Sequence, residues 1–105
     1  MNLSDTVKNT GLHLAMEWGP DFLKPIQGRL ALRYPELSAA ELDEANRICQ
    51  EAMRFGHSEV EKLAVAHQFN VNKAEFALVM QQAWPWVDAS NISGLFNQGM
   101  YYAMK

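Results

Sequence analysis

Two histidines in the sequence each precede a glutamate by four residues, a spacing that places both side chains on one face of a helix. The pairs are His13 with Glu17 and His57 with Glu61. Imidazole nitrogens and carboxylate oxygens both bind Zn²⁺, but a zinc site in a protein takes at least three protein ligands. Neither spacing indicates a third ligand. We therefore interpret both as ion pairs on helix surfaces and predict no metal site.

Two other residues of types that carry catalysis, His67 and Cys49, fall on apolar helical stripes. His67 shares its stripe with Val60, Leu63 and Ala64, so we expect a partly buried, hydrogen-bonded core histidine. A reactive thiolate needs positive charge nearby, whereas Cys49 lies among glutamates in the sequence and should behave as a small hydrophobic residue. The chain has no glycine-rich phosphate loop, nucleophile elbow, paired cysteines or calcium loop. We predict a non-enzymatic protein without catalytic residues or a cofactor.

Length and composition predict one globular domain, residues 1–105. The chain has 49% hydrophobic residues and a net charge of −3, enough apolar material for a core and too little charge for disorder. The longest purely apolar run, "FALVM", is far shorter than the roughly 20 residues of a membrane span, so we expect no membrane association. The first residues carry no apolar signal-peptide segment, and a single cysteine excludes an internal disulfide. Together these features predict a cytoplasmic location.

The elements that must position these residues are helices, because no stretch alternates polar and apolar residues as strands do. The prediction is an all-α, compact bundle of five or six helices. The expected helices cover about 5–18, 21–33, 39–55, 58–67, 72–84 and 91–104.

The expected helix starts rest on local capping signals. Ser38 and Ser58 each precede a glutamate by three residues, the spacing of a capping box, and Asn72 has the asparagine form of the same signal. Gly56 is expected to end the helix of residues 39–55. We also expect Asp43 and Arg47 to pair on the solvent face of that helix.

The stretch "AHQFNVNKAEFALVM", residues 66–80, resembles the helix-turn-helix motif in its apolar skeleton. Ala66 is the small residue where two helices would cross, Asn70 would take the left-handed conformation of the turn, and Phe76 would point into the core. The usual motif has glycine in the turn, and this chain has asparagine. The resemblance implies a helix-turn-helix-like three-helix core over about residues 38–84.

DNA binding by this core is the alternative function, that of a helix-turn-helix transcriptional regulator. The cations available to contact phosphates are Lys73, Arg29 and Arg33. Residues 36–61 contain seven acidic residues and only two arginines, and the exposed face of the second helix has no arginine to read bases. We therefore do not expect a nucleic-acid partner.

The preferred function is contact with a protein partner or with a second copy of the chain. Leu78 is expected to point away from the core, beside Gln81 and Gln82, and to be the apolar anchor of that face. Trp86, Tyr101 and Tyr102 lie in a segment with almost no charge, and tryptophan and tyrosine are enriched at interfaces. These six residues are the predicted partner-binding set. The protein would act as an adaptor, an inhibitor or immunity-type partner, or a self-associating regulator.

Overall fold

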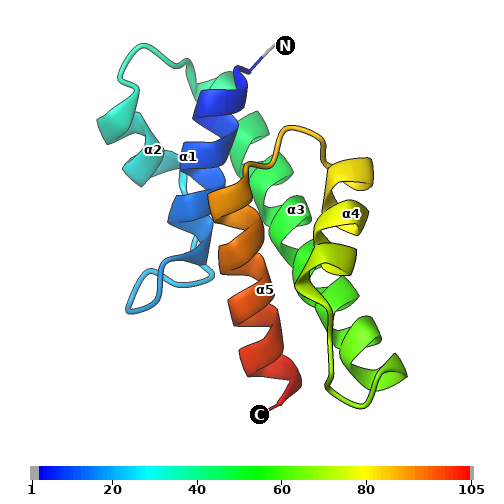
Figure 1. Ribbon diagram of the computed structural model, residues 1–105. Coiled ribbons are helices and arrows are strands. Elements are labelled where there is room, and N and C mark those ends of the chain that lie inside the picture. The colour runs from blue at the N-terminus through cyan, green and yellow to red at the C-terminus, as the bar shows by residue number, and fades with distance from the viewer. Residues whose placement is uncertain (1–2, 105) are drawn as a thin grey trace.

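The computed structural model describes residues 3–104, which form five α-helices that pack side by side (Figure 1). No β-strand occurs within this range. The predicted compact all-α bundle is therefore confirmed. The helices are α1 (Asp5–Met16), α2 (Gln27–Arg33), α3 (Ala39–Ala66), α4 (Lys73–Ala83) and α5 (Ala89–Ala103).

The longest helix, α3, is the axis of the bundle and contacts all four other helices. Helices α1 and α5 lie beside each other on α3, with α2 against α1 and α4 against α5 (Figure 1). Helices α2 and α4 do not contact each other. Among the described residues, no helix combines the length and the apolar character needed to cross a membrane.

Three predicted helix starts are confirmed by the side chains that cap them. Ser4 accepts from the backbone N–H of Val7, Asn72 accepts from that of Ala74, and Ser38 forms a complete capping box with Glu41. The last helix begins two residues earlier than expected, because Asp88 is its N-cap. Helix α2 begins at Gln27 and not near residue 21, since the chain before Pro25 forms turns.

The prediction of two helices, 39–55 and 58–67, is wrong, because residues 39–66 form one continuous helix. Gly56 does not end it but lies buried against α5, where an added Cβ would stand 3.2 Å from Leu95 Cδ1. The close approach of α5 stabilises the helical conformation through this glycine. Ser58 is consequently an exposed residue inside the helix and not a cap. The expected three-helix unit is reduced to two helices, α3 and α4, joined by a turn.

The turn after α3 also differs from its prediction. Gln68 and Phe69, and not Asn70, have the positive φ angles, 54° and 68°. Their N–H groups bond back to Val65 O and Ala64 O, the pattern of a Schellman cap. His67 is the C-cap and its side chain is 47% exposed. The prediction of a partly buried core histidine is therefore wrong. His67 stands beyond the last packed turn of α3, 3.8 Å from the Glu75 carboxylate.

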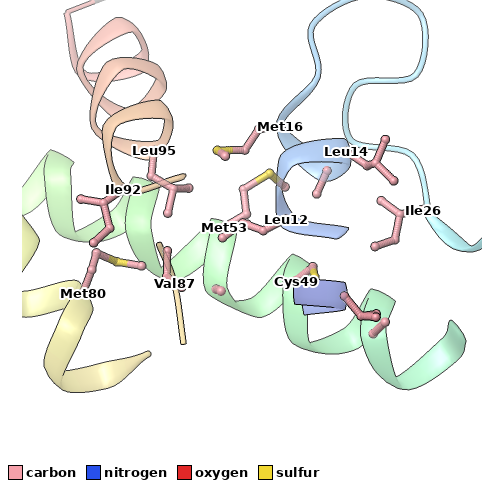
Figure 2. Packing of buried hydrophobic residues seen from close by; sticks show 14 of the residues in the cluster. Leu12, Leu14, Met16, Ile26, Cys49, Met53, Met80, Val87, Ile92 and Leu95 are labelled. Carbon is pink, nitrogen blue, oxygen red and sulfur yellow. The ribbon is translucent and has the colours of Figure 1, made fainter. Parts of the chain in front are cut away.

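The core lies along α3, where the other four helices pack against it (Figure 2). The expected position of Cys49 on an apolar stripe of α3 is confirmed, since it is fully buried together with Ala45 and Ala52, one turn before and after it. Phe76 of α4 points inward as expected and is fully buried, as is Met80 one turn further on, whereas Ala83 is exposed. The labelled side chains of the cluster are Leu12, Leu14, Met16, Ile26, Cys49, Met53, Met80, Val87, Ile92 and Leu95.

The outer face of α3 carries ion pairs in a different arrangement from the predicted one. Arg47 pairs with Glu44 and, at 3.2 Å, with Glu51. Asp43 instead accepts a hydrogen bond from Gln27 Nε2 at 3.2 Å. The expected pair of Asp43 with Arg47 is therefore wrong, because Arg47 has carboxylates within reach on the turns before and after it.

Candidate functional site

The walls of the candidate site are α1 and α5, which two buried amide side chains hold parallel. Asn91 Nδ2 donates to the main-chain oxygen of Asn9 at 2.9 Å. Two turns further along both helices, Gln98 Nε2 donates to the oxygen of Met16 at 2.5 Å. Both bonds join residues separated by 82 positions, so the two helices run side by side in constant register.

The same register fixes the chain that leads into α5. Asn9 Nδ2 donates to the carbonyl oxygen of Trp86 at 2.7 Å, and its Oδ1 accepts from the N–H of Asp88 at 2.9 Å. The Lys8 ammonium lies 5.3 Å from the centre of the Trp86 ring, and this ring also makes a T-shaped contact with Trp84. Trp86 is half-buried over the start of α1. The structure therefore separates it from Tyr101 and Tyr102, with which it was predicted to act.

A groove of about 770 Å³ runs between α1 and α5. Its α1 side consists of His13, Met16 and Glu17, with Trp18 just beyond the helix end. Gly94 has no side chain to fill the groove on its α5 side, where an added Cβ would lie 3.2 Å from Met16 Cε. The remaining lining residues, all from α5, are Ser90, Asn91, Asn97, Gln98 and Tyr101.

Four aromatic rings form a continuous patch at one end of this groove. Trp18 lies 4.7 Å from Phe22 and 5.5 Å from Tyr101, measured between ring centres. Tyr102 stacks on Phe22 at 6.2 Å and meets Tyr101 edge-on at 5.6 Å. Trp18 and Tyr101 are 57% and 55% exposed. We call these four rings, Trp18, Phe22, Tyr101 and Tyr102, the aromatic patch.

The patch contains two predicted partner-binding residues and two that sequence reasoning did not single out. Tyr101 and Tyr102 were predicted; Trp18 and Phe22 were not. Helix α1 ends at Met16 and not, as expected, near residue 18, so Trp18 lies in the chain that turns away before the Gly-Pro pair, and its ring is exposed. A large aromatic residue at such a stop was the available signal, but its proximity to residue 101 is not visible in the sequence.

His57 contacts both the aromatic patch and the buried amide side chain of Gln98. Its ring centre is 5.5 Å from that of Tyr102, and its Nε2 is 3.0 Å from Gln98 Oε1. Since the Gln98 amide nitrogen donates to Met16, its oxygen is the acceptor and His57 Nε2 is the donor. Burial lowers the pKa of His57, so the ring is neutral at pH 7. The expected ion pair with Glu61 is wrong, because the imidazole is turned toward α5.

Arg29 is a structural residue, although it was a candidate for contacting nucleic acid. Its guanidinium donates to the carbonyl oxygen of Leu14 at 2.8 Å and lies 3.5 Å from the Glu17 carboxylate. It also reaches main-chain oxygens of the loop before α2, at residues 21, 24 and 25. Arg29 thus caps the negative end of α1 and holds that loop. Glu17 pairs with Arg29 and not, as expected, with His13.

The other two nucleic-acid candidates do not complete a basic face. Arg33 is exposed at the end of α2, near a smaller hollow that also contains Asp5 and Asp88. Lys73 begins α4, on the opposite flank of the bundle (Figure 1). The three cations are therefore not brought together on one surface.

The predicted α4 surface is exposed but lies apart from the groove. Leu78 is 60% exposed, and Gln81 and Gln82 are exposed beside it, so the expected helix phase at these positions is confirmed. Helix α4 contacts α3 and α5 but not α1. The six predicted residues therefore fall on three separate surfaces.

Within residues 3–104, no three histidine, cysteine, aspartate or glutamate side chains converge in a way that would hold a metal ion. Comparison with other proteins adds no functional assignment: no protein-family model, curated protein or solved structure matches this chain.

Proposed function

We propose that this chain is a cytoplasmic, non-enzymatic protein-binding module whose groove between α1 and α5 holds a segment of a partner protein. One observation carries the proposal: Trp18 and Tyr101, each more than half exposed, meet at the end of a groove of about 770 Å³. Surface patches of this kind mark interaction sites, and tryptophan and tyrosine contribute strongly to binding energy there.

The polar groups of the groove support a binding role over a chemical one. The side chains of Asn91 and Gln98 line the groove and are engaged in hydrogen bonds that join helices, so they shape it. An adaptor, an inhibitor or immunity-type partner, and a self-associating regulator all use such a surface. DNA binding, the alternative, is supported by no arrangement of Lys73, Arg29 and Arg33.

The test is selection of binding peptides from a random library on the folded protein. We expect selected peptides to shift amide resonances of α1 and α5 in NMR spectra. The double variant Trp18→Ala/Tyr101→Ala should lose them, because it removes the two most exposed rings without touching the buried core. The matched control is Leu78→Ala, which truncates an equally exposed apolar residue on α4 and should bind normally.

The α4 surface is the competing location within the same experiment. Leu78→Glu should leave the stability within about 0.5 kcal/mol of the unsubstituted protein, since exposed substitutions cost little. If Leu78→Glu abolished peptide binding or self-association, measured by sedimentation, while the double variant kept both, the interface would lie on α4. The groove proposal would then be wrong.

A further inference from the structure

We infer that the corner between Trp18 and Tyr101 receives a basic side chain, lysine or arginine, from the bound protein segment. This inference rests on the proposed function and specifies the chemistry of its partner. It follows from three properties of the groove: the angle between the two rings, the charge of its lining and the shape of its α5 wall.

The two rings form two sides of a corner. Their planes meet at 73° and their centres are 5.5 Å apart. A cation is attracted to an aromatic face when it lies within about 6 Å of the ring centre. At this separation, a cation on the face of one ring also lies close to the other. Phe22, 4.7 Å from Trp18, supports the indole from outside the groove.

The lining has a charge that complements a cation. Glu17 is the only carboxylate among the described residues that line the groove, and no lysine or arginine lines it. Its side chain is 46% exposed, and, among the residues that the structure describes, only its Oε1 is paired, with Arg29 Nη1 at 3.5 Å. Arg29 itself is held by Leu14 O. The second oxygen of the Glu17 carboxylate can therefore pair with an incoming cation while the first stays with Arg29.

The α5 wall leaves space for the main chain that carries this side chain. Gly94 presents no side chain, so the groove stays open above Met16. Ser90 and Asn97 stand one turn before and after it, with polar side chains suited to the amides of an extended segment. The volume of about 770 Å³ falls in the range of sites that enclose a small ligand.

The test uses capped single residues that differ in charge. N-acetyl-lysine methylamide is compared with its Nζ-acetylated form, and the arginine derivative with the citrulline derivative. Binding is followed by NMR through the Trp18 indole N–H and the Tyr101 amide. We expect saturable shifts with both cations and at least about fivefold weaker binding of both neutral forms.

Two substitutions distinguish the contribution of the Glu17 charge to cation binding from that of the Trp18 ring. Glu17→Gln should weaken the binding of the cationic probes about two- to fivefold and leave the binding of the neutral probes unchanged. Glu61→Gln, which removes one exposed carboxylate from α3 away from the groove, is the matched control and should change neither. Trp18→Leu keeps an apolar side chain but should abolish the preference for cations.

The outcomes distinguish this inference from the function on which it rests. Equal binding of charged and neutral probes would overturn the inference that the corner binds a basic side chain, and so would selected peptides that occupy the groove without any basic residue. Either result would leave the groove as a binding site. No shift of Trp18 or Tyr101 with any probe, while selected peptides still bind the groove, would also overturn the inference. Selected peptides that bind elsewhere or not at all would overturn both.

Discussion

Gln98 Nε2 lies 2.5 Å from the main-chain oxygen of Met16, the last residue of α1. That carbonyl is one of the terminal four that a helix leaves without an internal partner. The other end of the same amide accepts from His57 on α3. A single buried side chain, 5% exposed, therefore joins three helices beneath the groove.

Replacing Gln98 with leucine should lower the free energy of unfolding by about 1 to 3 kcal/mol. The substitution leaves the Met16 carbonyl and the His57 ring nitrogen without their partner in a buried place. Urea denaturation followed by circular dichroism measures the change. Asn97→Ala, at the exposed neighbouring position, should cost little. An equally small loss for Gln98→Leu would show that water replaces the amide and that the link is not structural.

Gly99→Ala should destabilise the protein by about 1 to 3 kcal/mol, even though alanine favours helix more than glycine does. The new Cβ would lie 2.7 Å from Val60 Cβ, a clash that requires α5 to move away from α3. Thermal and urea denaturation measure the loss. Gly28→Ala is the control, because no atom lies within 4 Å of the added carbon, and it should stabilise by up to about 1 kcal/mol.

Val60→Ala tests the cause of that loss. Alone it should destabilise, because it removes buried methyl groups. Combined with Gly99→Ala, it should cost less than the sum of the two single changes, since the alanine methyl then fills the vacated space. Strict additivity would mean that the contact between these residues does not limit the approach of α5.

Stability should fall as the pH drops below about 6.5, the ordinary pKa of histidine. Burial lowers the pKa of His57, so the unfolded chain binds a proton at a higher pH than the folded protein does. The stabilisation is complete above the unfolded pKa and is lost progressively as the pH falls toward the folded pKa. Urea midpoints measured from about pH 8 to about pH 5 follow this loss.

The matched substitutions for this pH dependence are His57→Gln and His13→Gln. His57→Gln should flatten the decline, because glutamine can still donate to Gln98 and does not titrate. His13→Gln, at an exposed position of α1, should keep it. An unchanged decline in His57→Gln would assign the effect to other groups.

Cys49 should react slowly with thiol reagents while the protein is folded. It is fully buried, and burial raises the pKa of its thiol to about 12, so almost none is thiolate at pH 8. The rate of reaction with a disulfide reagent should increase steeply through the urea transition. Rapid labelling without denaturant would show that α1 separates from α3 in the native state, since Cys49 Sγ contacts the main chain at Lys8.

The part of the fold that depends on neighbours in the chain was predictable. Ser38 and Asn72 cap helices as expected, because a cap requires only a side chain and the backbone within the next turn. The buried stripe of Ala45, Cys49 and Ala52 follows from helical periodicity alone. The same periodicity correctly placed Leu78 in solvent.

The predictions failed where a contact distant in sequence outweighed a local signal. Ser58 and Glu61 have the spacing of a capping box, and Gly56 has the form of a helix stop, yet α3 continues. The packing of Leu95 on Gly56 and of Gly99 on Val60 stabilises one long helix more than a local break would. His67 was placed in the core by periodicity, but the helix ends just before it.

The sequence alone predicts an all-helical chain, the starts of α1, α3 and α4, and the inward-facing positions of Cys49 and Phe76. It also supplied Tyr101 and Tyr102 as exposed aromatic residues in a segment with little charge. The packing of the helices is what places Trp18 and Phe22 beside them and Trp86 elsewhere. The reason is the parallel register of α1 and α5: buried amides of Asn91 and Gln98 set it, and their acceptors are main-chain carbonyls. Every residue has such a carbonyl, so no side-chain pattern in the sequence identifies which one is used.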